Sequence, residues 1–246
     1  MNLLLVDLGN TRCVVARPLD ADLAGPLQRV LEVATPRNAA DGARLAVQLQ
    51  SLGAESSAVV AASVVPVVSE VLVARLPNVR LVDHTWDFPF GTAIRGAETV
   101  GADRWCNVAA AAQVGWTDAL IVDAGTATTI DVLTDGVFEG GLIAPGMAFA
   151  ARQLQLTAPR LWPVDFAPCD LRPGRDTSEA LQIGAFHVGV QGVGGTVQAL
   201  LAARPRARVA LTGGLGRFLV RADWAYEPDW TLRGLRCLHD RGLRAC

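Results

Sequence analysis

The chain of 246 residues contains no lysine, and arginine supplies all 22 of its basic side chains. A Walker A loop needs a lysine on the phosphates, a protein kinase needs a lysine on a strand, and a Schiff-base enzyme needs a primary amine. The sequence therefore excludes these three classes of protein. Any phosphate chemistry must rely on backbone amides, hydroxyl groups, arginine and a metal ion.

Other familiar site patterns are also missing. The chain has no G-x-S-x-G or H-E-x-x-H motif, and its three histidines are far apart in the sequence. Five scattered cysteines never form a C-x-x-C pair, which excludes a regular disulfide framework and a zinc ribbon. We expect them to be reduced thiols that mostly fill the core. They are Cys13, Cys106, Cys169, Cys237 and Cys246.

Long apolar runs and blocks of basic charge are lacking too. The net charge is −2 with no basic stripe, so nucleic acid is not an expected partner. The apolar run 58–65 ends at Pro66, well short of the roughly 20 residues that span a bilayer. The start, Met1–Asp7, lacks the charged segment of a signal peptide. We therefore expect a soluble, cytoplasmic protein without a membrane partner.

A strand–turn–strand unit occurs twice. The apolar run Leu3–Val6 leads into the polar turn Asp7–Thr11 and a second strand. About half the chain later, Ala119–Val122 leads into Asp123–Thr126 and the strand Thr129–Leu133. This internal repeat predicts an α/β fold of two duplicated lobes with a cleft between them.

The boundary between the lobes is predicted at residues 115–118, which gives an N-terminal lobe of residues 1–116 and a C-terminal lobe of residues 117–246. Apolar periodicity predicts further elements in both lobes. The expected strands are 13–16, 59–65, 80–83 and 207–211, and the expected helices are 103–114, 147–156 and 177–203. Asp176 and Glu179 have the spacing of a helix N-cap pair, and 159–173 is expected to be a loop.

Both turns combine a carboxylate at the end of a buried strand with a glycine and a hydroxyl residue. Glycine lets backbone amides approach a phosphate, and the carboxylate can hold a cation or its water ligands. A single turn of this kind usually only closes a hairpin. Two copies in matching positions favour the binding of a polyphosphate by both turns.

These motifs resemble those of a known family. The phosphate-1, phosphate-2 and adenosine motifs of the actin/hexokinase/Hsp70 superfamily are similar to Asp7–Thr11, Asp123–Asp131 and Thr212–Gly214. Within that superfamily, the type III pantothenate kinases have motifs that are similar to Gly101–Arg104, Gly140–Gly146 and Asp229–Leu235. The resemblance spans nearly the whole chain, with the motifs in the same order.

The resemblance implies two actin-like (ribonuclease H-like) lobes and a transferase. Its reaction would be the ATP-dependent phosphorylation of pantothenate to 4'-phosphopantothenate, the first step of coenzyme A biosynthesis. The implied cofactors are ATP, Mg²⁺ or another divalent cation, and K⁺ or NH₄⁺. A homodimer built on the long helices is also implied.

The resemblance further implies a role for each matching residue. The ATP contacts would be Asp7, Leu8, Gly9, Asn10, Thr11, Arg12 and Thr126. Asp7 would also lie near the divalent ion, and Asp123 would bind the monovalent cation. The substrate contacts would be Gly101, Ala102, Asp103, Arg104 and Thr177, with Asp103 as the catalytic proton acceptor.

The chemistry of Gly101–Arg104 agrees with this assignment. Phosphoryl transfer needs alignment, charge neutralisation and a carboxylate to take the proton of the attacking hydroxyl, which Asp103 can do. The guanidinium of Arg104 offers a planar fork to a substrate carboxylate. Both should lie in the first turn of a helix. The alternative interpretation is that Asp103 only caps this helix, that Arg104 forms a surface ion pair, and that Thr177 only belongs to a helix start.

One segment departs from the family pattern. Members commonly carry a Tyr-x-Asn-Pro stretch that begins seven residues before the glycine of this motif, but Ile94 stands there. Two alternatives therefore stay open. The chain is a kinase of the same fold with another small hydroxyl or carboxylate substrate, or a catalytically weak relative that acts as a regulatory accessory protein.

Overall fold

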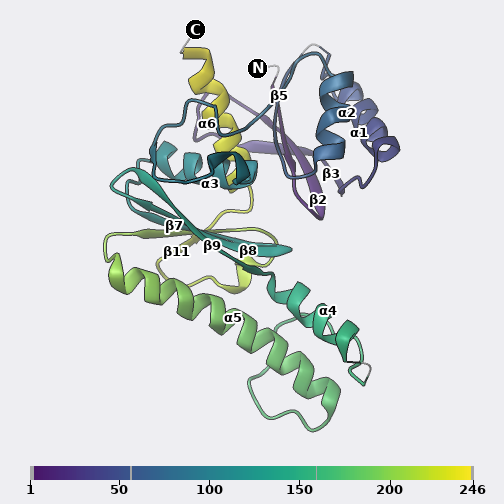
Figure 1. The fold of residues 1–246 in the computed structure, drawn as a ribbon, viewed down its shortest axis with the longest axis vertical. Coiled ribbons are helices and arrows are strands. Elements are labelled where there is room, and N and C mark those ends of the chain that lie inside the picture. Colours follow the sequence, from purple (N-terminus) through teal and green to yellow (C-terminus); the bar gives the residue numbers. More distant parts are fainter. Residues whose placement is uncertain (1–2, 56, 159, 245–246) are drawn as a thin grey trace. The chain divides into compact units, whose positions relative to one another are not determined.

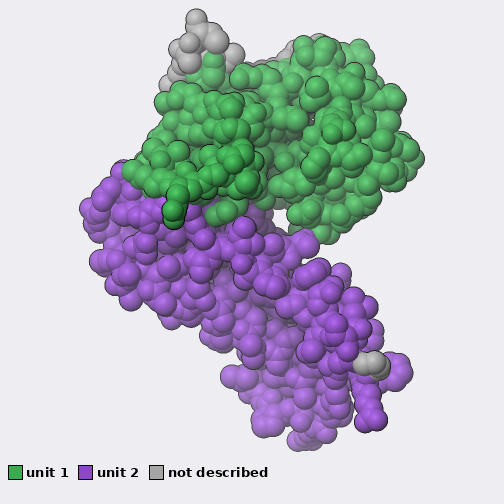
Figure 2. All heavy atoms as spheres, in the orientation of Figure 1, with its two compact units in different colours: residues 1–116, 136–138, 229–246 green, residues 117–135, 139–228 purple. Residues whose placement is uncertain are grey.

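The computed structural model describes residues 3–55, 57–158 and 160–244, and the chain forms two compact units (Figure 2). Unit 1 consists of residues 1–116, 136–138 and 229–246, and unit 2 consists of residues 117–135 and 139–228. The first break between the units follows residue 116. Residues 136–138 and 229–246, which the sequence analysis placed in the C-terminal lobe, cluster with unit 1 because they pair and pack with its elements.

Unit 1 is built on a five-stranded sheet in the order β3-β2-β1-β4-β5. The first three strands along the chain pair antiparallel, and β4 and β5 are added in parallel to β1. The strands are β1 (Leu3–Leu8), β2 (Arg12–Pro18), β3 (Leu27–Ala34), β4 (Ala58–Ser63) and β5 (Val79–Leu81).

Helices cover both faces of this sheet. Their bounds are α1 (Ala39–Ser51), α2 (Pro66–Arg75), α3 (Ala102–Gln113) and α6 (Trp230–Arg244). Leu4, Val6 and Leu8 share one core with α1 and α2, while α6 contacts β1 and β4, and α3 contacts β4. Side chains alternate along a strand, so Asp7 and Val6 point to opposite faces of the sheet. Asp7 therefore points to the face that carries α3 and α6.

Unit 2 contains most of the second sheet, in the order β11-β10-β7-β8-β9-β6. The short β6 (Gly91–Thr92) belongs to unit 1 and pairs with residues 137 and 138 of that unit. The other strands are β7 (Ala119–Ala124), β8 (Ala127–Thr134), β9 (Val137–Pro145), β10 (Arg208–Thr212) and β11 (Trp224–Tyr226).

Two helices pack on one face of the unit 2 sheet, α4 (Met147–Thr157) and α5 (Thr177–Ala203). Val122 of β7, Met147 and Val197 share a core there. Figure 1 shows α4 and the N-terminal half of α5 side by side, extending beyond the end of the sheet of unit 2. By strand alternation, Asp123 points to the other face of that sheet.

The structure confirms the elements that apolar periodicity predicts. The three expected helices occur at 102–113, 147–157 and 177–203, and the expected strands are present. The cap prediction is also confirmed, since the Asp176 side chain accepts the backbone N–H of Glu179 at 2.9 Å. The described part of the expected loop, 160–173, contains no helix or strand. Helices α1, α2 and α6 were not predicted.

Cysteines behave as small apolar side chains in the described part of the chain. Cys13, Cys106 and Cys237 are buried free thiols, and Cys169 is a half-buried free thiol. Cys246 lies outside the described residues. Across the same residues, we find no helix with both the length and the apolar character that crossing a bilayer requires.

Candidate active site

The first Asp turn closes the β1–β2 hairpin of unit 1. Asp7, near the end of β1, pairs with Val14 and with Ala62 on either side. The backbone N–H of Gly9 donates to the carbonyl of Arg12 at 3.1 Å, which makes the turn tight. A carboxylate at this place is half-buried and fixed by two neighbouring strands.

Thr35, which directly follows β3, stabilises the same turn. Its hydroxyl donates to the carbonyl of Gly9 at 2.7 Å, and its backbone N–H donates to the carbonyl of Thr11 at 3.0 Å. Asn10 and Thr11, which carry an amide and a hydroxyl group, are exposed. Arg12 is exposed as well, and its guanidinium forms an ion pair with Glu32 at 2.9 Å.

The Gly101–Arg104 motif forms the start of α3, as expected. Gly101 is the N-cap residue, and Asp103 and Arg104 lie in the first turn. The Asp103 carboxylate accepts the backbone N–H of Arg104 at 2.9 Å. A Cβ atom at Gly101 would lie 2.4 Å from this carboxylate, so the glycine leaves the space that Asp103 occupies.

Burial determines the proton affinity of Asp103. It raises the pKa of the carboxyl above its ordinary value of 3.8, and this outweighs the opposing effects of the Arg104 backbone hydrogen bond and the Arg104 charge. A carboxylate with a raised pKa is a stronger proton acceptor than a solvated one.

The structure brings Asp7 and Asp103 to the same region of unit 1. The backbone N–H of Val64 donates to the carbonyl of Leu8 at 3.1 Å, and its side chain lies 3.5 Å from the position of a Cβ at Gly101. The Cys106 thiol is affected by both carboxylates, because burial first and then the charges of Asp7 and Asp103 raise its pKa. The end of β1 and the start of α3 therefore lie close together in unit 1.

The second Asp turn lies in unit 2 between β7 and β8. Asp123 pairs with Thr129 and with Thr212 on either side. Gly213 has a φ of 77°, and a Cβ atom there would lie 2.4 Å from the Asp123 carboxylate. The late Thr-Gly-Gly motif and the second Asp turn are thus in direct contact within unit 2.

The two other predicted residues of unit 2 are exposed. Thr126 is in the turn after β7, where its carbonyl accepts the backbone N–H of Gly146 at 3.0 Å. Thr177 is the first residue of α5. The N-terminal end of α5 projects beyond the sheet of unit 2 in Figure 1.

The described part of the chain has no cluster of metal ligands. Within residues 3–55, 57–158 and 160–244, no three His, Cys, Asp or Glu side chains are placed to hold one ion. An ion at Asp7 would therefore take its other ligands from phosphate oxygens and water, as Mg²⁺ commonly does.

Sequence reasoning missed two supports of the site. Thr35 closes the first Asp turn, and nothing in the local sequence marks it. A group of four aromatic residues was also missed, of which Phe138 lies beside Arg104, although the pair Phe88 and Phe90 around Pro89 was a visible signal. We call Phe88, Phe90, Trp105 and Phe138 the aromatic cluster.

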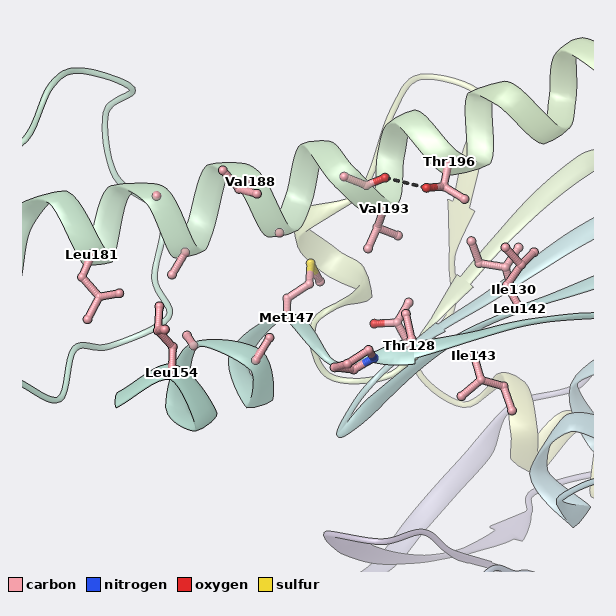
Figure 3. A pocket seen from close by; sticks show the side chains of 18 of the residues that line it. Thr128, Ile130, Leu142, Ile143, Met147, Leu154, Leu181, Val188, Val193 and Thr196 are labelled. Carbon is pink, nitrogen blue, oxygen red and sulfur yellow. Dashed lines mark hydrogen bonds between the residues drawn. The ribbon is translucent and has the colours of Figure 1, made fainter. Parts of the chain in front are cut away.

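A groove of about 630 Å³ runs between α4 and α5 of unit 2 (Figure 3). Figure 3 shows Leu154 of α4 and Leu181 of α5 pointing toward each other across it. Apolar side chains of its lining are strongly exposed, with 67% of Ile143 and 73% of Val188 accessible to solvent. Such an apolar surface is typical of a protein interface or a ligand groove.

Comparison with known proteins gives a consistent result over the whole chain. The family model of the type III pantothenate kinases matches residues 3–199. A protein named type III pantothenate kinase from Desulfosudis oleivorans is 34% identical over 254 residues, covering 96% of this chain and 98% of the relative. One with the same name from Thermomicrobium roseum is 33% identical over 260 residues, covering 99% and 98%.

Solved structures show the same fold. A putative Baf family transcriptional activator from Campylobacter jejuni aligns with a TM-score of 0.61 at 22% identity, covering 98% of this chain and 99% of that one. MreB 5 of Spiroplasma citri, bound to AMPPNP, aligns with a TM-score of 0.56 at 10% identity, covering 99% and 97%. These likenesses confirm the predicted fold class, two actin-like α/β lobes.

Proposed function

Since this chain belongs to the type III pantothenate kinase family, we propose that it transfers the γ-phosphate of ATP to the primary hydroxyl of pantothenate. The product is 4'-phosphopantothenate, and the reaction is the first step of coenzyme A biosynthesis. The observation that carries the proposal is the start of α3, where Asp103, with its raised pKa, stands next to Arg104 and close to Asp7.

Asp103 is the proton acceptor in this reaction. The substrate hydroxyl attacks the γ-phosphorus, the bond from phosphorus to the β,γ-bridging oxygen breaks, and ADP leaves. The hydroxyl proton passes to the Asp103 carboxylate late in the transfer. Arg104 binds the substrate carboxylate through its fork of N–H donors, which orients the hydroxyl. The other proposed substrate contacts of this motif are Gly101 and Ala102.

The two Asp turns are proposed to bind the phosphates of ATP. Asn10 and Thr11 present exposed amide and hydroxyl donors in the first turn, and Thr126 presents a hydroxyl in the second. The other proposed ATP contacts of the first turn are Leu8, Gly9 and Arg12. A divalent ion held at Asp7 neutralises phosphate charge when it is bound.

Asp123 is proposed to bind a monovalent cation, K⁺ or NH₄⁺. Its half-buried carboxylate lies against Gly213, near the end of β7. Oxygen ligands of this kind suit such a cation. When bound, the cation would supply positive charge for the phosphates in a chain that has no lysine.

The active form is proposed to be a homodimer that pairs through α4 and α5. The exposed apolar groove between these helices supports this, because burial in a partner would remove Ile143 and Val188 from water. Gly184 and Gly192 line the groove with open space above them, so another backbone can approach closely. Thr177, at the projecting end of α5, would then contact substrate with the help of the second copy.

A coupled assay of ATP consumption tests the proposal. Purified protein is assayed with and without pantothenate, first in potassium buffer and then in sodium buffer. Turnover that requires pantothenate and is higher in potassium is the expected result. ATP binding without pantothenate-dependent turnover would contradict the assignment and would favour another substrate or a regulatory relative.

A further inference from the structure

The Phe138 ring lies beside Arg104 of the substrate-side motif. Phe138 is fully buried in unit 1, and the centre of its ring is 5.8 Å from the guanidinium carbon of Arg104. This is within the range in which a guanidinium is attracted to an aromatic face. We propose that Phe138 is a positioning residue, whose ring holds the Arg104 guanidinium in the orientation that receives the substrate carboxylate.

Other aromatic rings fix the orientation of Phe138 itself. Trp105 meets the Phe138 ring edge-on at 5.4 Å and 80°, and Phe90 meets it at 6.1 Å and 89°. Phe88 stacks on Trp105 at 4.6 Å. Edge-to-face and offset contacts of this kind restrict a ring to one orientation, so the Phe138 face toward Arg104 is set before substrate arrives.

The backbone of Phe138 is held as well. Its carbonyl accepts the N–H of Ala93 at 3.0 Å, and the carbonyl of Gly136 accepts the N–H of Gly91 at 2.9 Å. The turn before it has positive φ at Asp135 and Gly136, 48° and 74°, as a tight hairpin requires. Ring and backbone are therefore both anchored, and the ring can act as a fixed support.

A fixed support matters because an arginine side chain has many rotamers. A substrate that must first order this side chain loses affinity for entropic reasons. The half-buried guanidinium next to the Phe138 ring has fewer orientations available. This inference rests on the proposed function, because it takes the pantothenate carboxylate as the ligand of Arg104. It assigns to Phe138 an effect on substrate binding and none on proton transfer.

The Phe138→Leu variant tests the inference. Leucine keeps an apolar side chain in the strand but removes the aromatic face. We expect the KM for pantothenate to rise roughly three- to tenfold, the range given by loss of a partly desolvated cation–π contact, while kcat stays within about twofold. Loss of binding alone changes KM without kcat. A pantothenate analogue with a neutral amide in place of the carboxylate should show the same KM with both proteins.

Phe90→Leu is the matched control. It removes a ring from the same aromatic cluster, but that ring is not the one facing the guanidinium. We expect its KM for pantothenate to rise less than in Phe138→Leu, because the ring that faces the guanidinium is kept and only one of the contacts that orient this ring is lost. Equal KM effects in the two variants would assign the effect to the packing of the cluster and would overturn the inference. If Phe138→Leu does not give a cooperative thermal transition, Phe138→Met replaces it.

A double-mutant cycle separates positioning from general structure. In an Arg104→Met background, Phe138→Leu should change the KM by less than about twofold, because the group that the ring orients is gone. A full effect in that background would overturn the inference. A wild-type protein without pantothenate turnover would overturn the proposed function, and this inference with it. Wild-type turnover with an unaltered KM in Phe138→Leu would overturn the inference alone.

Discussion

Asp103 combines a raised pKa with a place in the first turn of α3. In the Asp103→Asn variant the side-chain oxygen can still accept the Arg104 N–H, but it cannot take a proton. We expect kcat to fall about 10²- to 10⁴-fold, the range for loss of a general base. The ATP dissociation constant, measured by calorimetry without pantothenate, should stay nearly the same.

The control for this prediction is Glu70→Gln, which removes an exposed carboxylate from α2 and should leave kcat unchanged. If Asp103→Asn lost ATP binding as fully as turnover, the residue would have a structural role. The alternative interpretation, in which Asp103 only caps the helix, would then hold.

The same residue lowers the stability of the folded protein. The pKa of Asp103 is raised on folding, so between the unfolded and folded values the folded state binds more protons than the unfolded state. Stability therefore falls as pH rises through this interval, and the loss is complete above the folded pKa. We expect Asp103→Asn to be more stable than wild type in urea unfolding at pH 8. The difference should shrink as pH falls toward 3.8, the ordinary value, and a constant difference would contradict the assignment.

At the scale of elements, the crossing of α3 and α6 depends on one glycine. A Cβ atom at Gly234 of α6 would lie 1.9 Å from the carbonyl oxygen of Cys106 in α3. Backbone at this distance cannot move aside as a side chain can. Gly234→Ala should therefore lower the free energy of unfolding by about 1–3 kcal/mol, the usual cost of overpacking, as measured by urea denaturation.

Gly242→Ala in the same helix is the matched control. There a Cβ atom meets only the end of the flexible Arg80 side chain, at 3.4 Å. Alanine favours a helix over glycine by up to about 1 kcal/mol, so stability should be unchanged or slightly higher. Equal effects at both positions would show that helix propensity, and not the close approach of α3 and α6, determines the result.

At the scale of the whole molecule, the proposed homodimer can be tested on α5. Val188 lines the groove and is 73% exposed. Val188→Glu places a charge that is costly to bury in an interface, so sedimentation velocity should show a shift from dimer to monomer. Pantothenate turnover should fall with it, because Thr177 would lose the second copy.

Val73→Glu on α2 is the control for this experiment. Val73 is also an exposed apolar residue, 54% accessible, but it belongs to unit 1, whereas α4 and α5 belong to unit 2. This variant should keep the oligomeric state of the wild type. A Val188→Glu protein that sediments like the wild type would contradict an interface on α5.

Apolar periodicity and turn chemistry in the sequence predicted many of the local elements, including those that carry the candidate site residues. The runs that end in Asp7 and Asp123 are strands, the helix that starts at the Gly101 motif is α3, and Asp176 caps α5. These features depend on contacts between residues close in sequence. The absence of lysine excluded the Walker A proteins and the protein kinases. The order of the motifs along the chain indicated the family that the comparisons confirm.

Only the tertiary structure determined which distant segments meet. It places α6 on α3 through Gly234, adds residues 136–138 to unit 1, and brings Phe138 beside Arg104. Helix α6 was not predicted, and the supports Thr35 and Phe138 had no assigned role, because their effects arise from packing between residues far apart in sequence. Local patterns specify a strand, a turn or a cap, whereas close packing in the core decides which of them touch.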